Sequence, residues 1–344
     1  MITDYSKPSA DIALEANFLQ TADHKILQCQ RELSAMLASA PDRTSCLLCG
    51  QDINSGRAYR HRQVEYLFCS GCGHLQTKAQ LPSGYPLAFS GQGFDVIYPR
   101  LDEDAYRSRR DRIYLPKLEW AFSRLSQHAG GLEKVSGASW LEIGCGAGYF
   151  LNALRERGVE ALRGLDADER LVAVTNQYCG DGVACSTVDL FGDVANAEAD
   201  IYVAFFVLEH LEEVRRFWQI MGQKPAGTVF LFSVPTFGFA AAMEGAMHDY
   251  AARSLDSVLH TQLYTDQSID YALAEAGYEK TAEWLFGQDA QDLCRIIAGT
   301  LQSVMDAQLA ETHVQKLSVL IDPLQKVLDQ ARYCDARHII AIKR

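Results

Sequence analysis

The chain has 344 residues and a formal net charge of −12. This length predicts two domains, or one large domain with additions, and 48% hydrophobic residues suffice for a substantial core. The acidic charge argues against a polyanionic partner such as nucleic acid. No apolar run is long enough to span a membrane, so no membrane partner is expected.

The first residues lack the basic and apolar segments of a secretion signal, so we expect a cytoplasmic protein. Ten cysteines in such a protein are expected to be thiols or metal ligands rather than disulfides.

Residues 1–43 make the first predicted unit, which is mostly one helix. Ile26, Leu33 and Leu37 fall near helical spacing, and Pro41 ends the run. No side chain here suggests chemistry. We expect the helix to pack on another element or on a second copy of the chain in a homodimer.

Residues 44–80 carry two C-x-x-C-G motifs, whose cysteines are Cys46, Cys49, Cys69 and Cys72. Each motif presents two thiolates on a tight turn, and two pairs complete a tetrahedral site for structural zinc, Zn²⁺. The segment between them suits a β-hairpin. Such a module is too small for its own core, so metal must supply folding energy. The alternative is two unrelated redox pairs. Four thiolates fill the coordination shell of the zinc ion and leave no open position, so we expect this metal to have no catalytic role.

Residues 81–130 are predicted to be a linker followed by a helical segment near 103–128, with Pro116 dividing the helix.

Residues 131–344 begin with a strand, a glycine-rich turn and a helix. Trp140 to Ile143 read as a buried strand, and Gly144, Gly146 and Gly148 follow at once. Glycines let the backbone approach a ligand and allow positive φ, and a helix N-terminus favours polar or anionic groups. The G-x-G-x-G spacing differs from that of pyrophosphate sites.

Two acids support a ligand site at this turn. Glu142 lies at the end of the strand, and Asp166 follows the next strand. An acid about 20 residues beyond such glycines is placed to bind a ribose diol.

Strands and helices then alternate, which predicts a doubly wound parallel sheet. Strands are expected near 139–143, 161–165, 183–187, 200–206, 228–233, 279–285 and 337–343. Helices are expected near 148–157, 168–178, 211–221 and 266–276.

Two additions interrupt this alternation. Residues 234–262 form a long connection, and residues 288–333 form an insertion. Apolar spacing in the insertion predicts two amphipathic helices, with a kink in the second at Asp322–Pro323. They would cover the core or form a dimer surface.

The run Leu141 to Gly148 resembles the first motif of class I S-adenosylmethionine-dependent methyltransferases. The resemblance continues through Gly164–Asp168, Val188–Leu190 and Phe205–Leu211. It implies an α/β Rossmann-like sheet of seven strands, with the last strand antiparallel, and S-adenosylmethionine as cofactor. The alternative is a related domain that binds another nucleotide or has lost its ligand.

The resemblance implies that the glycine turn holds the methionine part of the cofactor, Asp166 the ribose, and Asp189 with Leu190 the adenine. The cofactor-binding residues so implied are Glu142, Gly144, Cys145, Gly146, Gly148, Asp166, Ala167, Asp189, Leu190 and Phe206. It also makes the segment before the turn a lid over the cofactor. Its candidate aromatic residues are Tyr85, Phe94, Tyr98 and Tyr106, which ordinary packing would equally explain.

Methyl transfer to a hydroxyl or carbon acid needs a base, and histidine is the usual one near neutral pH. Residues around His260 resemble a segment of deoxysugar C-methyltransferases in which a Glu–His pair carries the base, although Leu259 replaces the glutamate here. His210, next to Glu209, borders the expected pocket and is the alternative base. A further alternative is Asp289.

The order of zinc module, methyltransferase core and extended C-terminus resembles the zinc-containing sugar methyltransferases. It implies methyl transfer to a small-molecule acceptor, at a hydroxyl or carbon of a sugar or nucleotide-sugar. One alternative is an RNA methyltransferase, which the acidic charge and the missing Asn/Asp-Pro-Pro-Tyr motif oppose. Another is a non-catalytic, cofactor-binding adaptor.

Overall fold

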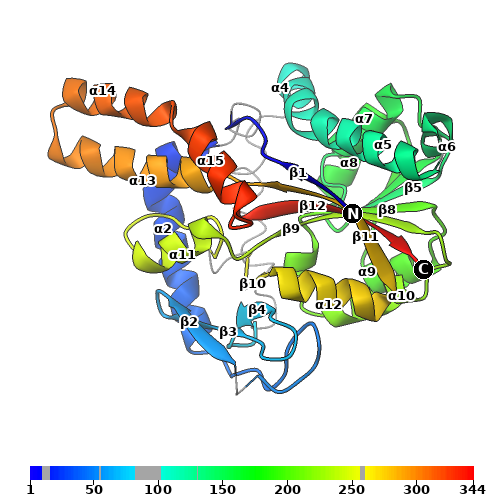
Figure 1. The fold of residues 1–344 in the computed structure, drawn as a ribbon, viewed down its shortest axis with the longest axis horizontal. Helices are drawn as coiled ribbons and strands as arrows, with labels where there is room; N and C mark the ends of the chain where they lie inside the picture. Colours follow the sequence, from blue (N-terminus) through cyan, green and yellow to red (C-terminus); the bar gives the residue numbers. More distant parts are fainter. Residues whose placement is uncertain (10–15, 54–55, 82–101, 130, 256–259) are drawn as a thin grey trace.

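The structure is a computed structural model that describes residues 1–344 except 10–15, 54–55, 82–101, 130 and 256–259. Its central sheet has the strand order β1-β11-β12-β9-β8-β5-β6-β7 (Figure 1). The strands are β1 (Ile2–Tyr5), β5 (Trp140–Ile143), β6 (Leu162–Asp166), β7 (Ala184–Ser186), β8 (Ile201–Phe205), β9 (Val229–Pro235), β11 (Tyr278–Phe286) and β12 (Ala336–Lys343). Only β12 runs antiparallel to its neighbours among these described strands.

The sheet has eight strands instead of the predicted seven, because β1 pairs in parallel with β11. This strand is short and only half-buried, so its sequence shows no run of apolar residues. A side chain adds to this pairing: Asp4 accepts hydrogen bonds from Trp120 Nε1 and Arg124 Nε, each at 2.8 Å.

Helices cover both faces of the sheet, as the alternation predicts. The helices of the core are α7 (Tyr149–Glu156), α8 (Glu169–Cys179), α9 (Leu190–Asn196), α10 (Val214–Gly222) and α12 (Asp266–Ala276). Successive side chains of β9 belong to two different hydrophobic clusters. Phe230 and Phe232 pack with α10 and α12, whereas Leu231 packs with α7. This alternation is expected of a strand buried on both sides.

The segment before β5 is one continuous helical run. It consists of α4 (Glu103–Arg109), a π-helical turn η1 (Arg110–Tyr114) and α5 (Leu115–Ala129), with α6 (Leu132–Ser136) after it. Pro116 therefore does not divide the segment as predicted. It lies in the first turn of α5, directly after the widened turn, where its missing N–H is tolerated. Of the four candidate lid aromatics, only Tyr106 lies within the described residues.

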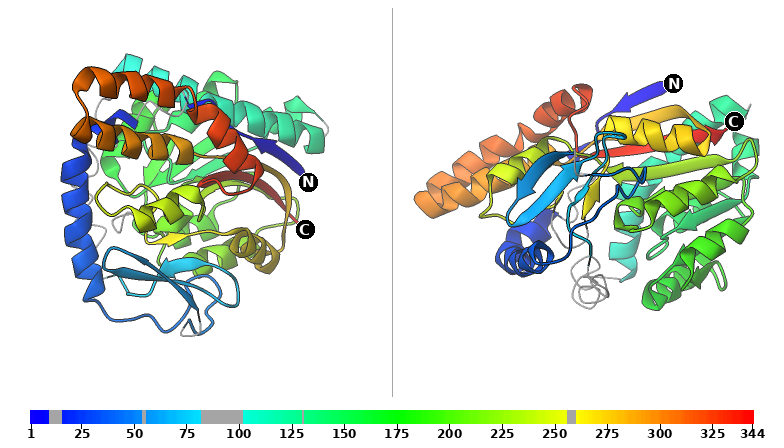
Figure 2. Two further views of the ribbon diagram at one scale, coloured as in Figure 1. Left: turned by 60° about the vertical axis from the view of Figure 1, so that its left-hand side comes forward. Right: turned by 90° about the horizontal axis from the view of Figure 1, so that it is seen from below.

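A second, smaller sheet contains the cysteine motifs. It has the order β10-β4-β3-β2, with β2 (Arg57–His61) and β3 (Val64–Phe68) forming the expected hairpin beside β4 (Leu75–Thr77). The fourth strand, β10 (Gln262–Leu263), comes from the long connection after β9. Helix α2 (Ala16–Ala38) packs Leu33 and Leu37 against this sheet within the same chain (Figure 2).

The insertion contains three helices instead of two: α13 (Asp289–Val304), α14 (Ala307–Ser318) and α15 (Ile321–Gln330). The chain turns before Asp322–Pro323, so the proline lies in the first turn of α15 and does not kink a helix. In Figures 1 and 2, α13 and α14 lie antiparallel and project from one end of the molecule. The long connection also contains α11 (Phe239–Ala246). None of the described helices combines the length and apolar character needed to cross a membrane.

Candidate functional site

The glycine turn after β5 depends on its glycines. Gly144, Gly146 and Gly148 have φ angles of 68°, 54° and 75°, a region that L side chains rarely adopt. A Cβ on Gly144 would lie 2.5 Å from Val207 Cγ2, so the loop after β8 packs directly on the turn. Gly148 is the N-cap of α7. The turn thus presents backbone at the carboxyl end of β5, where open α/β sheets bind ligands.

Asp166, at the end of β6, is tied to this turn. Its Oδ2 accepts a hydrogen bond from the backbone N–H of Gly146 at 2.7 Å, and its Oδ1 accepts one from Asp168 N at 2.9 Å. Burial raises the pKa of Asp166, and the backbone hydrogen bonds oppose that shift. Thr175 Oγ1 also donates to Gly146 O, at 2.8 Å. Sequence reasoning missed Thr175, because it lies mid-helix in α8 without a motif.

Glu142 lies beneath the turn and is only 3% exposed. Its Oε2 has no hydrogen-bond partner among the described residues. Burial raises its pKa well above the ordinary value, while the charge of Lys117 acts in the opposite direction. Lys117 is itself buried, with Nζ 4.3 Å from the ring centroid of Tyr114. Lys117 is a second residue that no motif indicated.

The remaining predicted cofactor residues follow β5, β6, β7 and β8, which are neighbours in the sheet. Asp189 is exposed and caps α9 by accepting from Gly192 N at 3.1 Å; Leu190 is half-buried. Cys145 is buried and Ala167 is exposed. Phe206 has a φ of 56°, one of few non-glycine residues described with a positive value. These residues all lie at the carboxyl edge of the sheet.

The three predicted catalytic residues come together. Glu209 and His210 belong to the short helix η2 (Leu208–His210) after β8, and His260 lies in the long connection, two residues before β10. One ligand atom from each lies within 4.8 Å of the others. The two imidazole rings stack at a centroid distance of 5.4 Å. Sequence reasoning offered the histidines as alternatives, whereas the structure makes them neighbours.

Glu209 is fully buried, and neither of its carboxyl oxygens has a hydrogen-bond partner among the described residues. Its Oε1 lies 3.9 Å from His210 Nε2. Burial raises the pKa of Glu209 to about 8. His260 Nδ1 lies 3.0 Å from the carbonyl oxygen of Arg253. The cluster therefore combines a protonatable buried acid with two imidazoles.

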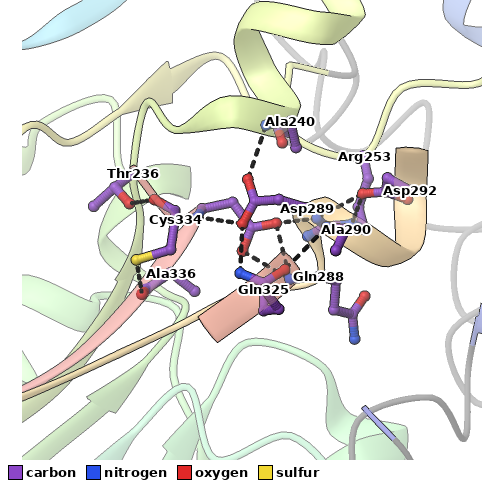
Figure 3. Close-up of polar contacts among 12 residues, drawn as sticks. Thr236, Ala240, Arg253, Gln288, Asp289, Ala290, Asp292, Gln325, Cys334 and Ala336 are labelled. Atoms are coloured by element: carbon purple, nitrogen blue, oxygen red, sulfur yellow. Dashed lines mark hydrogen bonds and ion pairs between the residues drawn. The ribbon is translucent and has the colours of Figure 1, made fainter. Parts of the chain in front are cut away.

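Asp289, the remaining candidate base, lies in a different network (Figure 3). It is fully buried and accepts hydrogen bonds from Ala240 N, Gln325 Nε2 and Asp335 N at 2.8–3.1 Å. Burial, with the charge of Asp335, raises its pKa to about 8. These contacts join α11, α15 and the start of β12, which indicates a structural role.

The four cysteines of the motifs form one buried cluster. Their Sγ atoms all lie within 4.8 Å of one another; Cys46 and Cys72 are 3.6 Å apart, and Cys49 and Cys69 are 3.5 Å apart. The two turns are built alike, since Gly50 N donates to Cys46 O at 2.9 Å and Gly73 N donates to Cys69 O at 2.8 Å. Four converging thiols fit the donor set of a tetrahedral zinc ion.

This cluster is connected to the site through β10. His74 Nε2 lies 2.7 Å from Gln262 Oε1, and Gln262 Nε2 donates to the carbonyl oxygen of Leu211 at 2.9 Å. Gln262 is two residues after His260, and Leu211 directly follows His210. The cysteine module therefore contacts both segments that carry the imidazoles.

Comparison with known proteins shows a family and finds several similar solved structures. Residues 106–283, just over half of the chain, match a family described as "Methyltransferase domain". Magnesium protoporphyrin IX methyltransferase from Synechocystis PCC 6803 with bound SAH is 12% identical with a TM-score of 0.47, over 76% of this chain and 99% of that one. A putative sarcosine dimethylglycine methyltransferase from Galdieria sulphuraria is 13% identical with a TM-score of 0.46, over 76% and 98%. No curated protein matches the sequence.

Proposed function

The chain belongs to the methyltransferase-domain family, and from this premise we propose that it transfers a methyl group from S-adenosylmethionine to a small-molecule acceptor that loses a proton. The observation that supports the proposal is that the candidate proton acceptors lie next to the glycine turn. The loop after β8, which bears Glu209 and His210, packs through Val207 against Gly144 of the glycine turn. A cofactor on that turn would thus lie beside the groups able to accept a proton.

The cofactor assignment rests on the carboxyl edge of the sheet. The glycine turn supplies open backbone for the methionine part, Asp166 supplies carboxylate oxygens for the ribose, and Asp189 with Leu190 flanks the adenine. Glu142, Cys145, Ala167 and Phe206 complete the surroundings. When bound, the cofactor supplies a methyl carbon already activated by sulfonium charge. The protein must align the acceptor and take its proton.

His260 is the proposed base, with His210 as its neighbour and alternative. An oxygen nucleophile or carbon acid must lose a proton during attack, and a neutral imidazole is suited to take it. Glu209 adds a buried acid at the same place. We propose a sugar or nucleotide-sugar as the acceptor class, because the order of cysteine module, core and C-terminal extension resembles that of sugar methyltransferases.

We further propose that the four cysteines hold one structural zinc ion. The thiols are buried and converge, and the module packs into the same core as Phe217, Trp218 and Tyr264. A module built on such small strands needs the metal for stability. A closed four-thiolate shell leaves the ion outside the chemistry.

The test is a turnover assay with S-adenosylmethionine and a panel of nucleotide-sugars, free sugars and RNA. We expect release of the demethylated cofactor together with a nucleotide-sugar heavier by one methylene group. Methylation of RNA alone would support the RNA enzyme instead. Tight cofactor binding without turnover on any acceptor would favour the adaptor.

A further inference from the structure

We propose that Arg253 is a positioning residue for the proton acceptor: three buried carboxylates fix it, and its backbone carbonyl holds His260 in the tautomer with the proton on Nδ1 and the basic lone pair on Nε2. This inference rests on the proposed function, because it concerns the same site. Arg253 lies in the long connection, between α11 and β10.

The side chain of Arg253 is fixed by two carboxylates from different elements. The Nε atom of Arg253 donates to Asp292 Oδ2 at 2.7 Å, and its Nη2 atom forms an ion pair with Asp335 Oδ2. Asp292 belongs to α13, and Asp335 directly precedes β12. Figure 3 shows Arg253 beside Asp292, at the edge of the network around Asp289. The arginine thus joins the connection to both the insertion and the central sheet.

The backbone around Arg253 is fixed by a third carboxylate. Glu244, in α11, is 2% exposed. Its oxygens accept from the N–H groups of Arg253 at 2.7 Å, of Ser254 at 3.0 Å and of Leu255 at 3.2 Å. With its side chain and the flanking N–H groups all held, Arg253 has little freedom to turn its carbonyl.

That carbonyl sets the tautomer of His260. A carbonyl oxygen can only accept, so at 3.0 Å the Nδ1 atom of His260 must carry the proton. In a neutral imidazole the other nitrogen then carries no proton. A base needs a lone pair directed at its proton, and this arrangement assigns that lone pair to Nε2. The stacked ring of His210 further restricts rotation of His260.

The cost of this arrangement supports a positioning role. Burying three carboxylates around a half-buried arginine costs desolvation energy, and apolar residues of similar size often stabilise a fold as well. What the ionic contacts add is a defined geometry. Here the ionic contacts fix the position of one backbone carbonyl, that of Arg253, which contacts the candidate base His260.

The experiment measures the tautomer directly, by ¹H–¹⁵N correlation of histidine side chains in the full-length protein, with His260→Ala to assign the signal. We expect the wild type to show Nδ1 protonated and Nε2 unprotonated. Arg253→Met should shift His260 toward a mixture of tautomers and lower kcat by about 10- to 100-fold at an unchanged KM for S-adenosylmethionine. Arg253→Lys should recover part of both effects.

The matched control is Arg332→Met, since Arg332 also bridges two carboxylates, Glu283 and Asp266, in the ion pairs of β11 and α12. It should leave the tautomer of His260 unchanged. If Arg253→Met does not fold, Glu244→Gln tests the same carbonyl through the backbone. A wild-type His260 protonated at Nε2, or a tautomer that neither variant alters, would overturn the inference. The expected tautomer in a protein without turnover would instead overturn the proposed function.

Discussion

The imidazole rings of His210 and His260 lie nearly parallel, with centroids 5.4 Å apart and planes inclined by 26°. His210 follows β8 and His260 lies in the connection after β9, and these two strands are neighbours in the sheet. Because the rings touch, a change at either position alters the surroundings of the other. Their roles must therefore be separated by paired variants.

Replacing the proposed base should stop chemistry without affecting cofactor binding. His260→Ala is expected to reduce turnover by about 10²–10⁴-fold, the usual contribution of a positioned base. Affinity for S-adenosylmethionine should stay the same, because Asp166 lies at the end of a different strand. Steady-state kinetics and calorimetry measure the two effects. If His210→Ala loses turnover while His260→Ala remains active, the base is His210.

Asp166→Ala should weaken S-adenosylmethionine binding about tenfold or more, since each hydrogen bond to a charged group contributes about 1.5–3 kcal/mol. The variant also releases the N–H of Gly146. Calorimetry measures the affinity. Asp168→Ala is the control, because Asp168 caps α8 and pairs with Arg170. Equal affinity in wild type and Asp166→Ala would place the ribose elsewhere.

Purified protein should contain about one equivalent of zinc per chain, as four thiolates complete one tetrahedral site. The double variant Cys49→Ser, Cys72→Ser should lose the metal and unfold at a lower temperature. Cys185→Ser should keep it, because Cys185 is exposed and lies outside the cluster. Metal analysis with thermal melting gives both readouts. A double variant with full zinc content would contradict the assignment.

Glu209 should make the protein less stable at alkaline pH. Burial raises its pKa from 4.5 to about 8. Between these values the folded protein keeps a proton that the unfolded chain has released, so the free energy of unfolding falls as the pH rises through this window. In Glu209→Gln that contribution disappears, and the melting temperature should decline less from about pH 5 to about pH 9. Identical slopes in wild type and variant would show that Glu209 titrates normally.

The sequence predicted the central sheet well because its strands are buried on both faces. Strands such as β8 and β9 are short apolar runs between turns, and the structure has them close to the predicted positions. The glycine turn was equally predictable from the sequence, since its positive φ angles favour glycine. These features depend on local sequence patterns, so each can be predicted from one short stretch of the sequence.

Features that depend on distant partners were not predictable. β1 and β10 are each four residues or fewer, and they are strands only because β11 and β4 lie beside them. Lys117 and Thr175 reach the site from helices without any motif. The contact between Arg253 and His260 likewise depends on carboxylates from three separate elements, which no local pattern in the sequence reveals.

The pairing of β4 with β10 also has a consequence for synthesis on the ribosome. All four cysteines have emerged before β5, from which the parallel core of the central sheet is built, so the proposed metal site could form early. Its sheet, however, lacks its last strand until residues 262–263 appear, and His74 and its partner Gln262 are 188 positions apart. Such non-local pairing forms slowly. Until β10 is synthesised, the edge of β4 in the cysteine module therefore stays unpaired. We expect the nascent chain to require protection from aggregation at this edge.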